Sequence, residues 1–389
     1  MILDVNSPLE GGHLDRTNPQ GTYNSTYFEQ VYGIIEAFKN YPNTLGFFAG
    51  NEVINEESTK SVPAYIRVCK FHMVCRLCML VLTYIPFQAV QRDMKDYIAK
   101  HSERAIPVGY SAADVREILM DTVNYMSCDL SNSSSSRSDF FGLNSYSWCG
   151  NSSYTTSGYD ILAEKFSNAT LPIFFSEFGC NVVRPRIFTE VEALYNENMS
   201  QAFSGGLVYE YSQQSNDYGL VKLDDNGAVT LLEDYDNLQK QYLKVDMDRV
   251  ESLTYGQISA KPQKCTPSLI KTHGFLESFD LPERPVEVQE MIDHGFSNGT
   301  PGRLLPVKQP SFPDVVYDLN GNSVPGFKMQ VLDSLTSNSP RRVVHAANST
   351  GDELPAPGND SSNESNASRI PVSFKLFLWA VGIALADIL

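Results

Sequence analysis

The sequence predicts an α/β fold whose strands run parallel. Short apolar runs alternate with longer segments of helical periodicity, a pattern typical of repeated βα units. A helix between two strands returns the chain to the same end of the sheet, so that the strands lie parallel. Two of the apolar runs end at a glutamate, Glu52 and Glu177. The edge reached by the carboxyl ends of parallel strands is where active sites of such folds lie.

Six apolar runs have the length and composition of strands, namely Ile2–Val5, Leu45–Ala49, Ile106–Tyr110, Phe140–Asn144, Ile173–Ser176 and Leu207–Tyr211. A TIM-type (β/α)8 barrel contains eight parallel strands. The first of the six runs begins at Ile2. We therefore expect a TIM-type (β/α)8 barrel that lacks its first two strands.

Two helices stand out between these strands. The segment Tyr27–Asn40 places apolar residues on one face at helical spacing. A second helix is expected over Phe188–Phe203, beginning near Thr189, with glutamates in its first turn, where the helix dipole favours negative charge.

The composition divides the 389 residues into four regions. Residues 1–260 are expected to form the barrel, and residues 261–340 a C-terminal extension with little regular structure except a β-like patch near 315–331. Residues 341–368 read as a Ser/Asn-rich linker, because such a composition buries too little apolar surface to fold. Residues 369–389 form an apolar tail.

This tail resembles a signal for glycosylphosphatidylinositol (GPI) attachment. A small, polar stretch at 361–368 precedes an apolar run at 374–386, which is shorter than the ~20 residues that a transmembrane helix needs. The expected attachment residue is Asn366, with Asn363 as the other candidate. The alternative is a tail-anchored membrane protein. We expect the protein at the extracellular face of the plasma membrane, linked to the membrane by this anchor, and in the cell wall.

Asparagine sequons also favour secretion. They lie at Asn24, Asn132, Asn151, Asn168, Asn198, Asn298, Asn348, Asn359, Asn363 and Asn366. No signal peptide is recognisable at Met1–Val5, which lacks a basic segment and a sufficient apolar segment.

The charge balance excludes one class of partner. The formal net charge is −16 and the isoelectric point is about 4.8, whereas a nucleic-acid-binding protein needs a basic surface. We therefore expect no nucleic-acid partner.

Residues 68–88 interrupt an otherwise continuous helical pattern, which is restored when Arg67 is joined to Ala89. The codons available for Val68 to Gln88 can contain intron splice signals, so that this segment is interpreted as an unspliced intron. A metal site built from its cysteines is the weaker alternative, because their spacing matches no zinc pattern. Four cysteines remain outside it, Cys128, Cys149, Cys180 and Cys265, and an even number in a secreted protein suggests two disulfides.

The two glutamates suggest the chemistry. A lone glutamate after a strand is more often a surface charge or a helix-capping residue. Here Asn51 directly precedes Glu52, and in retaining β-glycosidases built on (β/α)8 barrels an Asn-Glu pair ends the fourth strand and a second glutamate ends the seventh. One acid and one nucleophile are the minimum set for cleaving a glycosidic bond. We expect the reaction to need no cofactor and no metal.

Several motifs together resemble the fungal β-1,3-glucanosyltransferases of glycoside hydrolase family 72, in the subgroup without a Cys-rich carbohydrate-binding module. The matching segments are Phe48–Val53, Pro107–Ser111, Asn144–Gly150, Phe174–Asn181, Phe188–Val191, Ser204–Tyr209 and Tyr218–Val221. The resemblance runs from about residue 1 to 270, without the segment 68–88.

The resemblance implies a role for each matching residue. Glu52 would be the acid/base and Glu177 the nucleophile, with Asn51 holding the donor sugar. Other substrate-binding positions would be Asp15, Arg16, Asp114, Arg116, Tyr146 and Tyr209. The family's disulfide pattern would pair Cys149 with Cys180 and Cys128 with Cys265.

The resemblance also implies the activity, which is retaining cleavage of an internal β-1,3-glucosidic bond and transfer to the non-reducing end of another β-1,3-glucan. Donor and acceptor glucan chains would be the partners. The sequence departs from the family at its start, where a signal peptide and two strands are expected. Two alternatives remain, an endo-β-1,3-glucanase with water as the acceptor, or a catalytically dead GPI-anchored wall glycoprotein.

Overall fold

The computed structural model describes residues 1–55, 90–130, 134–253, 261–279, 284–303 and 315–325. The segment 68–88, the linker 341–368 with Asn366, and the tail 369–389 lie outside these residues. The chain divides into two compact units. The first comprises residues 1–209, 240–245 and 254–306, and the second comprises residues 210–239, 246–253 and 307–389.

The first unit is built on a six-stranded parallel sheet. Its strands follow one another in sequence order, and they are β1 (Ile2–Asp4), β2 (Gly46–Asn51), β3 (Val108–Ala113), β4 (Phe141–Asn144), β5 (Ile173–Phe178) and β6 (Gly206–Val208). These are the six strands that the sequence predicts. They confirm the expected fold class, a TIM-type barrel of which the described residues form six parallel strands.

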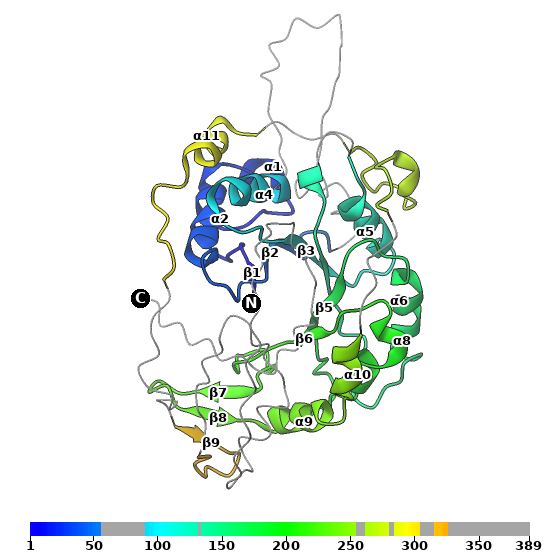
Figure 1. The fold of residues 1–389 in the computed structure, drawn as a ribbon. Helices are drawn as coiled ribbons and strands as arrows, with labels where there is room; N and C mark the ends of the chain where they lie inside the picture. Colours follow the sequence, from blue (N-terminus) through cyan, green and yellow to red (C-terminus); the bar gives the residue numbers. More distant parts are fainter. Residues whose placement is uncertain (56–89, 131–133, 254–260, 280–283, 304–314, 326–389) are drawn as a thin grey trace, which may run out of the picture. The chain divides into compact units, whose positions relative to one another are not determined.

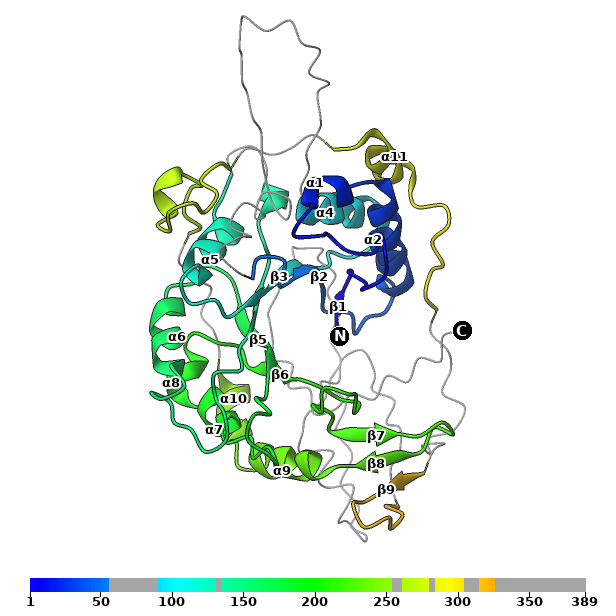
Figure 2. The same ribbon diagram turned by 180° about the vertical axis from the view of Figure 1, so that it is seen from behind.

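Helices link the strands of the first unit and make the parallel order possible. They are α1 (Pro19–Thr22), α2 (Ser25–Phe38), α4 (Val90–His101), α5 (Leu119–Ser127), α6 (Tyr159–Phe166), α7 (Glu190–Leu194) and α8 (Glu197–Ser200). Figures 1 and 2 show α2, α4, α5, α6 and α8 on the outer side of the strands. The interior of the curved sheet therefore faces away from the helical layer.

Local sequence sets the bounds of these helices. Asn24 caps α2 by accepting a hydrogen bond from the backbone N–H of Tyr27, an arrangement that satisfies one of the free donors at a helix start. The single helix expected over Phe188–Phe203 is instead two short helices, α7 and α8. Asn196 causes the break, because its side chain accepts from the N–H of Met199 and begins a new helix.

Aromatic side chains fill much of the core behind the sheet. The rings of Tyr32 on α2 and Tyr97 on α4 stack with their centroids 4.0 Å apart, and both residues are fully buried. A glycine permits one close approach at the sheet, since a Cβ on Gly109 would lie 2.4 Å from the ring of Phe140. Packing of this density fixes the strands relative to the helices.

Residues 254–306 belong to the first unit. Their described parts contain the 3-10 turn η3 (Pro267–Leu269) and the helix α11 (Val286–His294). A disulfide joins Cys128 at the end of α5 to Cys265, and α11 contacts α4 and α2. The domain boundary expected near residue 260 stays a prediction, although this segment packs against the helices of the sheet.

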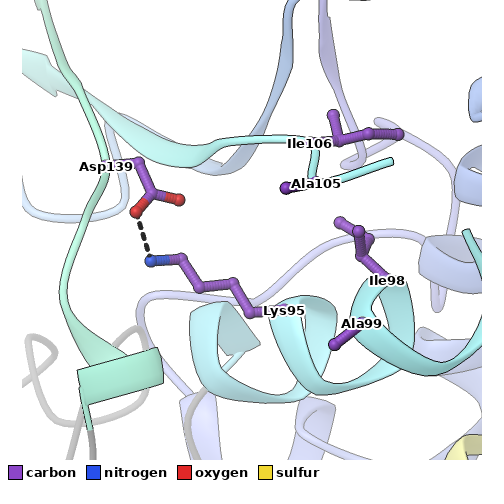
Figure 3. A pocket seen from close by; sticks show the side chains of 6 residues that line it. All are labelled: Lys95, Ile98, Ala99, Ala105, Ile106 and Asp139. Carbon is purple, nitrogen blue, oxygen red and sulfur yellow. Dashed lines mark hydrogen bonds and ion pairs between the residues drawn. The ribbon is translucent and has the colours of Figure 1, made fainter. Parts of the chain in front are cut away.

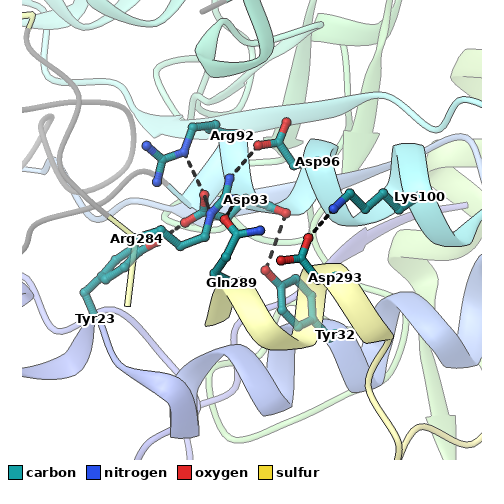
Figure 4. Close-up of polar contacts among 9 residues, drawn as sticks. All are labelled: Tyr23, Tyr32, Arg92, Asp93, Asp96, Lys100, Arg284, Gln289 and Asp293. Carbon is teal, nitrogen blue, oxygen red and sulfur yellow. Dashed lines mark hydrogen bonds and ion pairs between the residues drawn. The ribbon is translucent and has the colours of Figure 1, made fainter. Parts of the chain in front are cut away.

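A buried charge cluster fastens this segment to α4. The side chain of Asp93 is fully buried and receives hydrogen bonds of 2.7 Å from Arg92 and from Arg284, and the hydroxyl of Tyr23 also donates to it. Figure 4 shows both guanidinium groups turned toward this one carboxylate. Two cations and a hydroxyl supply the partners that a buried carboxylate requires.

The second unit contains a small sheet. Strand β7 (Val221–Leu223) pairs antiparallel with β8 (Val229–Leu231), and β9 (Val316–Tyr317) pairs parallel with β8. Helix α9 (Glu233–Tyr242) begins in this unit, which also holds α10 (Met247–Ser252). Strand β9 falls within the region where the sequence suggests a β-like patch.

Within the described residues, no helix combines the length and the apolar character needed to cross a membrane.

Candidate active site

The two glutamates lie at the carboxyl ends of their strands, as the sequence predicts. Asn51 is the last residue of β2, Glu52 follows it, and Glu177 is the last residue but one of β5. Glu52 adopts a positive φ of 50°, which is uncommon for a residue other than glycine. Its backbone N–H donates a 2.9 Å hydrogen bond to the carbonyl of Ser111 on β3, and this bond holds the strained turn that aims the carboxylate.

Asn144, the last residue of β4, lies between the two carboxylates. Its amide nitrogen Nδ2 is 3.0 Å from Oδ1 of Asn51 and 2.9 Å from Oε1 of Glu52. Asn144 is also the register partner of Glu177 on β5, and its side chain interacts with that carboxyl group. One amide therefore ties the three predicted site residues into a single arrangement.

Opposing effects act on the pKa of Glu177. Burial raises this pKa above its usual value, and the nearby charge of Glu52 raises it further, because both disfavour the ionised carboxylate. Hydrogen bonds from Tyr146, Asn51 and Asn144 lower it, since they stabilise the ionised form. The bond from the hydroxyl of Tyr146 to Oε2 is 2.5 Å long.

Tyr209 follows β6 and lies beside Tyr146. The two rings meet edge to face, with centroids 6.3 Å apart and planes at 83°. The backbone N–H of Tyr209 bonds to the carbonyl of Phe178, and its own carbonyl accepts a 2.6 Å bond from the buried guanidinium of Arg186. These two bonds fix Tyr209, directly after β6, at the edge of the sheet where Glu177 lies.

Asp114 and Arg116 form an ion pair on the loop after β3. The hydroxyl of Ser145 donates a 2.7 Å bond to Oδ2 of Asp114, which links this pair to the end of β4. A disulfide between Cys149 and Cys180 joins the loops after β4 and β5. Both disulfides that the family resemblance implies are thus present.

Asp15 and Arg16 lie apart from this hydrogen-bond network. Asp15 accepts hydrogen bonds from Thr17, which lower its pKa, and Arg16 is exposed. In the described part of the chain, no hydrogen bond joins either of them to the glutamates. Arg16 and Glu52 both act electrostatically on Tyr110, whose hydroxyl accepts from the N–H of Ile54 beyond Glu52.

Sequence reasoning missed three residues of this site, namely Asn144, Ser111 and Ser176. The hydroxyls of both serines contact Oδ1 of Asn144. Asn144 had one signal, since it is the last residue of the predicted strand Phe140–Asn144. Serine within a buried strand has no comparable signal, because only the neighbouring strands supply its partner.

A pocket of about 190 Å³ lies at the opposite ends of these strands. It is lined by Lys95, Ile98, Ala99, Ala105, Ile106 and Asp139. Figure 3 shows Lys95 reaching Asp139 across it, at 2.7 Å. Asp139 and Ile106 precede β4 and β3, and in barrels of this class the amino-terminal face contributes stability. Among the described residues, no group of three His, Cys, Asp or Glu side chains could hold a metal ion.

Comparison with known proteins decides the family. Residues 1–74 and 81–246 match the glucanosyltransferase family of glycoside hydrolase family 72. The chain belongs to this family. The interruption at residues 75–80 falls inside the segment 68–88.

Two relatives of this chain come from fungi. It is 57% identical to the 1,3-beta-glucanosyltransferase gel2 of Aspergillus fumigatus over 350 residues, which cover 90% of this chain and 68% of gel2. It is 45% identical to the probable 1,3-beta-glucanosyltransferase GAS3 of Saccharomyces cerevisiae, over 78% of this chain and 56% of that relative.

Solved structures give the same result. A crystal structure of ScGas2 matches with a TM-score of 0.53 and 36% identity, over 70% of this chain and 57% of that one. A structure of Saccharomyces cerevisiae Gas2p in complex with laminaritetraose and laminaripentaose matches with a TM-score of 0.52 and 36% identity, over 74% and 53%. The chain thus spans little more than half the length of these structures.

Proposed function

We propose that this glucanosyltransferase-family protein elongates β-1,3-glucan by cutting one glucan chain and transferring the cut end to another. The supporting observation is the position of Asn144, whose amide contacts Asn51 and Glu52 while its backbone is paired with Glu177. Two carboxyl groups are thereby held around one small site. The relatives named 1,3-beta-glucanosyltransferases and the Gas2p complex with laminari-oligosaccharides support the choice of substrate.

In the first step Glu177 attacks the anomeric carbon of an internal β-1,3-linked glucose. The bond from that carbon to the leaving glucan breaks, and Glu52 gives a proton to the departing oxygen. A covalent glycosyl-enzyme and a shortened glucan result. A retaining reaction of this kind needs the two carboxyl groups about 5–5.5 Å apart.

In the second step the 3-hydroxyl at the non-reducing end of an acceptor glucan attacks the same carbon. Glu52, now ionised, takes the hydroxyl proton, and the bond to Glu177 breaks. A new β-1,3 bond forms and both carboxyl groups return to their starting states, as retention by double displacement requires.

The sugar contacts are assigned by position. Tyr146 and Tyr209 offer two rings beside Glu177, and Asn51 offers its amide next to Glu52. Asp114 and Arg116 present a fixed ion pair on the adjacent loop. Among the described residues no hydrogen bond joins Asp15 or Arg16 to the glutamates, and we assign them to another part of the same glucan chain.

Product analysis tests the reaction. The purified protein is incubated with laminari-oligosaccharides, and products longer than the donor are expected. Products no longer than the donor would instead identify an endo-β-1,3-glucanase, and no turnover would fit a non-catalytic wall glycoprotein.

Two variants test the residues. Glu177→Gln is expected to lose both transfer and hydrolysis, and Glu52→Gln to lose at least a hundredfold in rate, within the range seen for general acid–base groups. Glu164→Gln on the exposed face of α6 is the matched control and should keep full activity. Normal turnover by Glu177→Gln would contradict the assignment.

We also propose that the protein lies at the outer face of the plasma membrane and in the cell wall, held by a GPI anchor at Asn366. The pattern of residues 361–389 supports this proposal. Release of the protein from cells by a phosphatidylinositol-specific phospholipase tests it. Retention in the membrane after that treatment would favour the tail-anchored alternative.

A further inference from the structure

Three buried polar side chains form a layer directly beneath the two glutamates. Ser111 on β3, Asn144 on β4 and Ser176 on β5 are 2%, 3% and 8% exposed. The hydroxyl of Ser176 lies 2.7 Å from Oδ1 of Asn144, that of Ser111 lies 3.0 Å from the same atom, and the two hydroxyls are 2.8 Å apart. Neighbouring strands thus contribute one side chain each to a closed triangle of contacts.

The backbone makes room for this triangle at Gly142. A Cβ at that position would lie 2.5 Å from Oγ of Ser176, which is closer than nonbonded atoms approach. Only a glycine in β4 lets Ser176 reach across to Asn144. A larger residue at position 142 would therefore displace Ser176 and disrupt its contact with Asn144.

The acceptors on Asn51 and Glu52, together with the serine hydroxyls, determine which way the Asn144 amide faces. As oriented, its NH2 group donates to Oδ1 of Asn51 and Oε1 of Glu52 and also interacts with the carboxyl group of Glu177, and its oxygen accepts a serine hydroxyl. A flipped amide would set its oxygen against those two acceptors and would leave its N–H groups facing the serines. A side-chain amide takes the orientation that satisfies its donors and acceptor together.

We propose that Ser111 and Ser176 are positioning residues for acid catalysis, acting through Asn144 on Glu52. The amide N–H occupies Oε1 of Glu52, so that the proton is carried by Oε2, the oxygen left free to face the glycosidic bond. The serines keep the amide in this orientation. This inference rests on the proposed function, because it concerns the proton transfer in that reaction.

The test compares two donors in the variant Ser111→Ala combined with Ser176→Ala. A laminari-oligosaccharide needs the proton from Glu52, whereas the same oligosaccharide with a 2,4-dinitrophenyl leaving group departs without one. For the double variant we expect kcat/KM to fall at least tenfold with the plain donor and less than threefold with the dinitrophenyl donor. Each single variant should show a smaller loss of the same kind, because one hydroxyl remains to bond the amide oxygen.

A matched control is available outside the site. Ser138 is fully buried and its hydroxyl donates a 3.0 Å bond to the side-chain oxygen of Gln91, so that Ser138→Ala removes a similar bond. Ser138→Ala should leave kcat/KM unchanged with both donors. Equal losses on the two donors in the serine double variant, or no loss on either, would overturn the proposal.

A second measurement does not depend on turnover. In protein labelled with ¹⁵N-asparagine, the side-chain amide of Asn144 is identified by its absence in Asn144→Asp. Its resonance should move in Glu52→Gln, and its protons should exchange with water at least tenfold faster in the serine double variant. An unchanged exchange rate would overturn the positioning role. Wild-type protein that turned over neither donor would count against the proposed function, and the amide measurement would still decide the network.

Discussion

The hydroxyl of Tyr146 donates a 2.5 Å hydrogen bond to Oε2 of Glu177, and it is the largest of the effects that lower the pKa of this buried carboxyl group. Burial acts in the opposite direction and is larger. A nucleophile must be ionised to attack, so the bond from Tyr146 maintains the reactive form in a site that otherwise disfavours it.

Tyr146→Phe should therefore raise the pKa of Glu177 further. The acid limb of the pH profile of kcat/KM is expected to move to higher pH, because more base is then needed to ionise the nucleophile. At pH 5 the rate should fall about tenfold, the effect of losing one hydrogen bond to a charged group. Tyr41→Phe removes a hydroxyl bonded to the carbonyl of Arg303, away from the site, and should not move the profile. An acid limb in the same place for wild type and Tyr146→Phe would contradict the assignment.

Arg186 should prove important for substrate binding without touching the glutamates. It is 2% exposed, donates to the carbonyls of Gly179 and Tyr209, and lies 4.7 Å from the ring centre of Phe188. Arg186→Met leaves those buried carbonyls without this donor and should lower the unfolding free energy by about 2–4 kcal/mol. Because Tyr209 loses its anchor, KM for laminari-oligosaccharides should rise more than kcat falls.

The neighbouring Arg184 provides the comparison. It is exposed and donates to the carbonyl of Asn181, so that Arg184→Met should change neither stability nor KM by more than a small amount. Equal behaviour of the two methionine variants would show that the buried guanidinium does not hold Tyr209.

Glu190 should make the stability of the fold depend on pH. Burial raises its pKa from 4.5 to about 7, although the charge of Arg186 lowers it in part. The folded protein therefore binds this proton more tightly than the unfolded chain. This difference in proton binding contributes at most roughly 3 kcal/mol to the unfolding free energy. The contribution is fully present below pH 4.5 and is lost as the pH rises to about 7.

Denaturant unfolding at pH 5 and pH 8 measures this effect. Glu190→Gln cannot ionise, so the loss of stability between the two pH values should be smaller in the variant than in wild type. Glu197→Gln, at an exposed position in the first turn of α8, should keep the wild-type difference. If Glu190→Gln also kept it, the carboxyl group would not be the source.

Arg284 should stabilise the packing of residues 284–303 against α4. Its guanidinium bonds to Asp93 and to Asp96, and removing one partner of a buried ion pair costs about 3–5 kcal/mol. Arg284→Met should show a loss of this size in denaturant unfolding. Figure 4 also shows the pair Lys100 and Asp293, which is 48% and 40% exposed. Lys100→Met should lower the unfolding free energy by no more than about 1 kcal/mol. Comparable losses in the two variants would contradict the expectation that the buried pair contributes more than the exposed one.

The strands and the two glutamates could be predicted from the sequence because their signals are local. Each strand is an apolar run, and Glu52 and Glu177 each follow such a run closely. The helix expected over residues 188–203 failed for a reason that is also local, because the capping bond of Asn196 competes with the helical pattern. The pairing of Arg284 with Asp93 spans 191 residues, and nothing near either residue indicates the other.

The sequence by itself determined the fold class, the family and the pair of acids that the chemistry needs, because motifs and periodicity depend only on residues close together in the chain. The tertiary structure alone decided which side chains surround those acids. Asn144 reaches Glu52, and Ser111 and Ser176 reach Asn144, only because β3, β4 and β5 lie side by side, with a register shift between Leu143 and Asn144 that brings Asn144 opposite Glu177. Hydrogen bonds act over about 3 Å, so their partners are fixed by the alignment of strands distant in sequence.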